Sequence, residues 1–112
     1  MLSASIDWEE YTLPWEIEIV VKGLCADYRR RCAVIEARGA SYKVIMEYRF
    51  LNYRIFNAAI EIVGEREALS FIEEIGNGDG YAKSNSHLSE SVYKKRKKEV
   101  KFNIAKRLLL YE

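Results

Sequence analysis

The stretch KVIMEYRFLNYRIFNAAIEIVG, residues 43–64, decides the fold class of this chain. Apolar side chains recur in it at steps of three and four residues, which places them on one face of an α-helix. Ser41 is positioned to cap this helix at its start, and Gly64 to end it. We therefore predict a long helix and expect it to be the most buried one. Its inward stripe is Val44, Tyr48, Leu51, Ile55, Ala59 and Ile62, widened by Ile45, Phe56 and Val63.

A second long helix is predicted over about residues 12–38. The segment Thr12–Glu16 supplies a capping hydroxyl, a proline in the first turn and a glutamate near the positive end of the helix dipole. Gly23 marks an expected weak point or bend, and Gly39 an expected stop. The inward candidates are Ile17, Val20, Leu24, Tyr28, Cys32 and Ile35.

The rest of the chain predicts two more helices joined by a long loop. A short helix is expected over about residues 66–75, ended by Gly76. Residues 76–88 are rich in glycine and small polar side chains, which predicts a loop with one helical turn around 81–84. Ser89 is a suitable N-cap for the final helix. The inward candidates are Leu69, Ile72 and Ile75 in the short helix, and Tyr93, Val100, Ile104, Leu108 and Tyr111 in the final one.

Taken together, these elements predict one all-α domain over residues 1–112. We expect a small bundle of about four helices with a helix-turn-helix-like C-terminal part, and residues 1–11 as a loose arm or a short turn. No stretch approaches the ~20 apolar residues that a membrane span needs. The N-terminus also lacks the basic start and apolar run of a secretory signal, so a cytoplasmic protein is expected.

Catalytic and metal-binding patterns do not emerge from the sequence. Cys25 and Cys32 are seven residues apart, a rise of about 10 Å in one helix, which is too far for a disulfide. The single histidine, His87, has no matching nucleophile, and no second cysteine pair completes a zinc site. The GNGDG run at 76–80 lacks the spacing of a phosphate loop or a calcium loop. We therefore expect two reduced cysteines, no metal, no cofactor and no enzymatic activity.

Charge is distributed very unevenly along the chain. The total is +1, but the first 82 residues carry nine basic and fourteen acidic side chains, a net charge of −5. Residues 83–107 carry nine basic and two acidic side chains, a net charge of +7. Five of the basic residues are consecutive, Lys94–Lys98. An asymmetry of this kind suggests a polyanionic partner.

The basic run lies in the first half of the predicted final helix, as in a recognition helix whose N-terminal residues reach base edges in the major groove. The candidates for base contacts are Ser89, Ser91, Lys94 and Lys95. Those for phosphate contacts are Lys83, Ser84, Arg96, Lys97, Lys98 and Lys101. A solvated charged face on an ordinary helix is the alternative. About a dozen residues separate the two C-terminal helices, whereas the turn of a helix-turn-helix has three or four. Either Gly80–Ser84 forms a degenerate first helix, or the final helix docks in another way.

A second basic cluster, Arg29-Arg30-Arg31, follows Tyr28. Its arginines either touch the DNA backbone or pair with glutamates of the 43–64 helix, and we favour pairing.

The segment SESVYKKRKKEVKFNIAKRL, residues 89–108, resembles the C-terminal helix of phage transcription regulators of the ArpU/RinA type, which are similar in turn to the helix-turn-helix of sigma-factor region 4. The shared features are Ser89, Ser91, Tyr93, the basic run, the apolar end Ile104–Leu110 and, near the N-terminus, Asp27–Arg31. The glycine-rich 76–80 stretch departs from the family, which would have a compact helix there.

The resemblance implies a phage or prophage DNA-binding transcription regulator. Double-stranded DNA is the expected ligand, a homodimer the expected assembly, and RNA polymerase a further expected partner. The main alternative is a helical protein-interaction module that offers tyrosines and tryptophans to a partner and does not bind nucleic acid.

Overall fold

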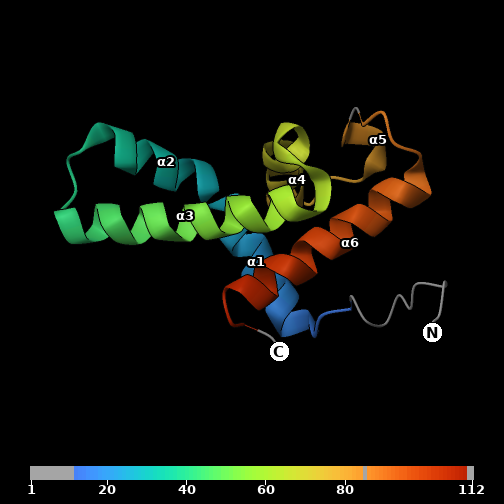
Figure 1. The fold of residues 1–112 in the computed structure, drawn as a ribbon, viewed down its shortest axis with the longest axis horizontal. Helices are drawn as coiled ribbons and strands as arrows, with labels where there is room; N and C mark the ends of the chain where they lie inside the picture. Colours follow the sequence, from blue (N-terminus) through green and yellow to red (C-terminus); the bar gives the residue numbers. More distant parts are fainter. Residues whose placement is uncertain (1–11, 85, 111–112) are drawn as a thin grey trace.

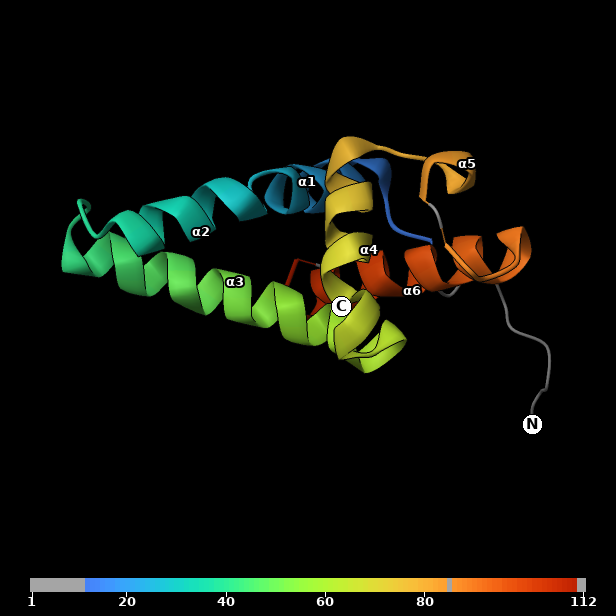
Figure 2. The ribbon, with the colours of Figure 1, turned by 90° about the horizontal axis from the view of Figure 1, so that it is seen from above.

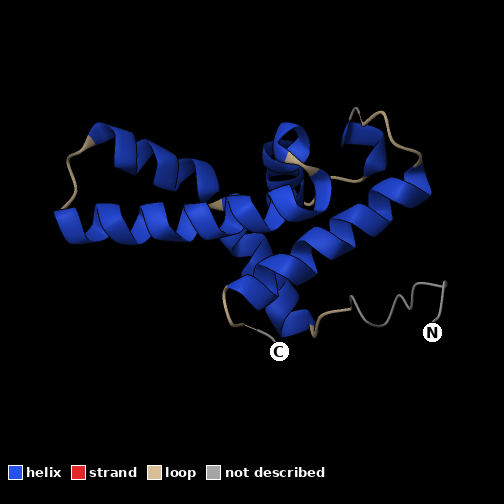
Figure 3. Ribbon diagram, in the orientation of Figure 1, coloured by secondary structure: helices blue, strands red, loops and turns tan. Residues whose placement is uncertain are grey.

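A computed structural model describes residues 12–84 and 86–110, which form six helical segments and no strand (Figure 3). The predicted all-α class is confirmed. The arm expected at residues 1–11 and Tyr111 lie outside the described residues. The helices are α1 (Trp15–Ala26), α2 (Tyr28–Ala37), α3 (Tyr42–Val63), α4 (Glu65–Asn77), α5 (Tyr81–Ser84) and α6 (Glu90–Arg107).

Helix α3 forms the axis of an elongated molecule that measures 49 × 32 × 23 Å (Figures 1 and 2). Helix α2 folds back along the first half of α3, and the two extend together to one side of the molecule. The second half of α3 packs against α4 and α6, while α1 packs mainly against α4. The N-terminal half of α6 extends to the opposite side, where α5 lies against it.

The 43–64 stretch forms the predicted helix. The Ser41 side chain accepts a hydrogen bond of 3.3 Å from the backbone N–H of Val44, and Gly64 ends α3 with a φ of 82°. Ile55 and Ala59 from the predicted stripe are fully buried. The core of the described residues also takes Ile72 and Ile75 from α4, and Tyr93, Val100 and Ile104 from α6, all five of which were predicted to face inward. Phe71 of α4, which was not predicted, is also in the core, whereas the predicted Leu69 is only partly buried.

The prediction of a single helix over about residues 12–38 is wrong, because the structure divides this segment into α1 and α2 at Asp27. The division follows from packing, since α1 lies against α4 whereas α2 lies against α3. Gly23, the expected bend, lies inside α1, and α2 ends at Arg38, which adopts the left-handed conformation expected of Gly39. Val20 is consequently 42% exposed, and the buried α1 positions are Val21 and Cys25.

Gly76 does not end the short helix predicted over about residues 66–75, which corresponds to α4. Helix α4 continues to Asn77, and Gly78 ends it with a φ of 75°. Gly76 is buried where α4 crosses α1, and a Cβ atom there would lie 2.6 Å from the Cα of Ala26. Because a side chain would collide with that backbone, glycine permits the close approach of the two helices.

The 76–88 loop is held against α6 by its predicted helical turn, α5. The Tyr81 hydroxyl donates a 2.6 Å hydrogen bond to the carbonyl of Leu88, and its ring centroid lies 5.5 Å from that of Tyr93.

Both cysteines are free thiols, as predicted, and burial raises the pKa of Cys25 to about 12. Within residues 12–84 and 86–110, no helix has the length and apolarity to cross a membrane.

Candidate nucleic-acid interface

Helix α6 begins at the predicted cap. The Ser89 side chain accepts a hydrogen bond of 3.4 Å from the backbone N–H of Val92, so its oxygen stabilises the helix start. Ser84 is similarly engaged, because its hydroxyl donates to the carbonyl of Tyr81 at 2.7 Å and accepts from the N–H of Ser86 at 3.1 Å. These two predicted DNA contacts therefore serve local structure, whereas Ser91 is exposed on the first turns of α6.

One face of α6 carries an open groove of about 490 Å³, which we call the lysine groove. Lys94, Lys98 and Lys101 recur in it at steps of four and three residues, which places them on one side of a helix. Among the residues that the structure describes, none that lines this groove carries a carboxylate. The described residues that line it are Ser91, Lys94, Lys97, Lys98 and Lys101, so the structure brings together five of the ten predicted site residues.

Acidic neighbours partly balance these lysines. Lys94 forms an ion pair of 2.8 Å with Glu90, one turn earlier on α6, and both side chains are exposed. Lys101 forms one of 2.7 Å with Glu18 of α1. Pairs between exposed side chains contribute about 0–1 kcal/mol, so a phosphate group can displace the Glu90 carboxylate from Lys94 at small cost.

Lys97 differs from its neighbours because its side chain is partly buried and its ammonium group is bound by the protein itself. It donates a hydrogen bond to the carbonyl of Asp79 and lies 5.7 Å from the centroid of the Tyr93 ring. Burial, followed by repulsion from Lys101, lowers its pKa. Lys97 therefore fastens the loop after α4 to α6 and forms a wall of the groove, instead of reaching outward as predicted.

The remaining predicted contacts lie outside the lysine groove. Arg96 pairs with Glu99 at 3.0 Å, Lys95 is half-buried elsewhere on α6, and Lys83 is exposed on α5. Five consecutive basic residues cannot share one face, because successive residues are rotated by about 100° around a helix. Three residues of the basic run, Lys94, Lys97 and Lys98, therefore line the lysine groove, and the other two lie on other faces of α6.

Helix α1 extends the basic surface in a way that the sequence did not reveal. A second groove, of about 350 Å³, shares Lys97 and Lys101 with the lysine groove and adds Lys22, together with Glu18, whose carboxylate pairs with Lys101. Trp15 and Ile19, which are 68% and 56% exposed, also line it. These α1 residues have the i, i+4, i+7 spacing of one helix face, but nothing in the sequence placed that face beside α6.

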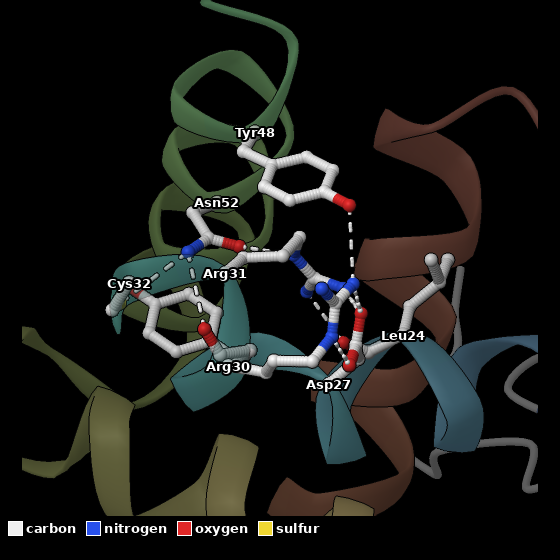
Figure 4. Close-up of polar contacts among 8 residues, drawn as sticks. Leu24, Asp27, Arg30, Arg31, Cys32, Tyr48 and Asn52 are labelled. Atoms are coloured by element: carbon white, nitrogen blue, oxygen red, sulfur yellow. Dashed lines mark hydrogen bonds and ion pairs between the residues drawn. The ribbon is translucent and has the colours of Figure 1, made fainter. Parts of the chain in front are cut away.

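The arginines of the second basic cluster form contacts within the protein, and Figure 4 shows those of Arg30 and Arg31. Arg31 is buried, with 2% exposure, and Arg30 donates hydrogen bonds to both carboxylate oxygens of Asp27, at 2.6 and 2.7 Å. Arg29 pairs with Glu73 of α4. Pairing was the favoured interpretation, but the acidic partners are Asp27 and Glu73 and not glutamates of α3.

No family model, curated protein or solved structure matches this chain. The resemblance to ArpU/RinA-type regulators therefore stays a prediction. Among the residues that the structure describes, no group of three or more histidine, cysteine, aspartate or glutamate side chains is arranged to hold a metal ion.

Proposed function

We propose that this protein binds double-stranded DNA through the lysine groove of α6. The observation that supports this most directly is a groove whose described lining consists of four lysines and one serine and holds no carboxylate. Lysine side chains neutralise phosphates, and serine hydroxyls donate to phosphate oxygens or base edges. The resemblance to phage regulators makes control of transcription, together with RNA polymerase, the expected setting of this binding.

The position of α6 suits this role. Its basic N-terminal half extends from the bundle, with α5 beside it (Figure 1). The major groove of B-DNA admits an α-helix, and Ser91 and Lys94 are exposed on the first turns. The C-terminal half is anchored, because Val100 and Ile104 are fully buried.

Salt dependence tests the proposal. If about four phosphates are neutralised, the logarithm of the association constant falls against the logarithm of salt concentration with a slope of about −3.6. The measurement is fluorescence anisotropy with a labelled random duplex, repeated with single-stranded DNA and with RNA. A protein-interaction module would show no duplex binding even at low salt.

A matched pair of charge reversals locates the interface. Lys98→Glu, in the groove, is expected to weaken duplex binding at least about tenfold, and adding Lys94→Glu to abolish it. Arg66→Glu makes the same charge change at an exposed position of α4 that forms no ion pair with any described residue, and should have a small effect. Equal losses for Lys98→Glu and Arg66→Glu would remove α6 from the interface.

A further inference from the structure

An exposed apolar stripe runs along the outer face of α3. Its members are Tyr42, Met46, Phe50 and Tyr53, which are 77%, 42%, 61% and 69% exposed. Their steps of four, four and three residues align them on one side of the helix. The core residues Ile55 and Ala59 point the other way. Contiguous exposed apolar surface of this kind marks interaction sites in soluble proteins.

The surface around Phe50 has both a projection and recesses. An apolar groove of about 470 Å³ lies on one side of the ring and is lined by Met46, Glu47, Phe50, Leu51, Arg54 and Leu108. A second groove, of about 460 Å³, lies between Phe50 and Arg107. A twofold interface brings the same patch of two copies together, so that patch must be complementary to itself. A projecting ring beside a recess on the same face meets this requirement.

Charges beside the stripe are also self-complementary. Glu47 and Arg54 are seven residues apart, so they lie on the same edge of the stripe. Neither forms an ion pair with any other described residue, although the Arg54 guanidinium lies 5.0 Å from the centroid of the Phe50 ring. When two such helices pair in antiparallel orientation, Glu47 of each copy comes opposite Arg54 of the other, which forms the ion pair twice.

We propose that the α3 stripe is a homodimer interface in which two copies pair antiparallel across a twofold axis. The Phe50 ring of each copy enters the groove beside Leu51 and Leu108 of the other, and Glu47 pairs with Arg54 across the axis. The stripe shares no residue with the lysine groove, so the dimer leaves the lysine groove of each copy open. This inference stands independently of DNA binding.

The test is sedimentation of the full chain over a wide concentration range. The wild type is expected to form dimers, and Phe50→Glu monomers with an unchanged helical circular dichroism spectrum. Trp15→Glu, at a similarly exposed aromatic residue of α1, should still form dimers. A monomeric wild type, or loss of dimers in Trp15→Glu alone, would overturn the proposal.

A charge exchange tests the orientation without altering the apolar residues. Glu47→Arg and Arg54→Glu are each expected to weaken dimerisation at least about tenfold, because each places like charges opposite each other twice. The double variant Glu47→Arg/Arg54→Glu restores opposite charges and is expected to recover the dimer. A double variant no better than the single ones would rule out the antiparallel pairing.

Discussion

The Nε atom of Arg31 donates a hydrogen bond of 2.6 Å to the side-chain oxygen of Asn52, and both side chains are buried (Figure 4). Arg31 also donates to the carbonyl of Leu24, and the Asn52 amide donates to the carbonyl of Tyr28 at 3.3 Å. This network fastens α2 and the end of α1 to α3. Burial lowers the pKa of the Arg31 guanidinium, so its hydrogen-bond acceptors must compensate for the lost water.

Replacing Asn52 by leucine is expected to lower the free energy of unfolding by about 3 kcal/mol. The substitution leaves the buried Nε–H of Arg31 without its acceptor, while the Leu24 carbonyl and the Asp27 carboxylate still accept from the other two guanidinium nitrogens. Urea denaturation followed by circular dichroism measures the loss. The double variant Arg31→Met/Asn52→Leu makes the pair apolar and should recover more than half of it. A single variant as stable as the wild type would show that Asn52 is dispensable to Arg31.

Gly76→Ala is expected to destabilise the protein by about 2 kcal/mol, although alanine is the better helix former. The new methyl group would lie 2.6 Å from the Ala26 backbone, so α1 and α4 would have to separate. Thermal unfolding measures the change.

Gly23→Ala is the matched control within α1. Nothing lies within 4 Å of the position that its Cβ would occupy. It should therefore stabilise the protein by about 0.5–1 kcal/mol through helix propensity. Opposite signs for the two glycines are the specific expectation, and equal effects would contradict the close crossing.

The local sequence predicted α3 and the start of α6 accurately, because their signals act over a few residues. Ser41 and Ser89 cap the helices that they precede, and Gly64 ends α3. The turn at Tyr81–Ser84 was predicted for the same reason. The errors at Gly23 and Gly76 have a different origin. Whether a glycine ends a helix, bends it or admits a neighbour depends on what packs there, and the sequence does not state this.

The candidate site shows the same limit. The spacing of Lys94, Lys98 and Lys101 follows from helix geometry alone and was available from the sequence. The burial of Lys97 against the Asp79 carbonyl and the position of Lys22 beside α6 depend on how α1 and the loop after α4 pack. Tertiary packing therefore decides which members of a basic run reach solvent.

Asp27, at the junction of α1 and α2, is expected to make stability depend on pH in the acid range. Hydrogen bonding to Arg30 lowers the pKa of its carboxyl group. A carboxyl whose pKa is lower in the folded state stabilises the protein fully above its unfolded pKa of about 4. That contribution is lost as the pH falls through the folded pKa.

Asp27→Asn should therefore reduce stability at neutral pH and weaken its dependence on pH below about 4. Urea midpoints measured from pH 2 to 7 test this. Glu36→Gln, at an exposed position of α2 that forms no ion pair with any described residue, is the control. Identical acid profiles for Asp27→Asn and the wild type would contradict the role assigned to Asp27.

Glu18→Gln is expected to increase the affinity for duplex DNA about threefold, the equivalent of one weak ion pair. The Glu18 carboxylate holds the Lys101 ammonium at 2.7 Å, and its removal leaves that ammonium available to a phosphate. Anisotropy titrations at constant salt concentration measure the gain.

Glu73→Gln gives the matched comparison for Glu18→Gln, because it makes the same charge change at an acid that pairs with Arg29, which lines neither basic groove. A gain in Glu18→Gln alone would locate the phosphates at the groove of α6. If both variants gained equally, DNA would be responding to the total charge of the protein, and Lys101 would have no particular part in binding.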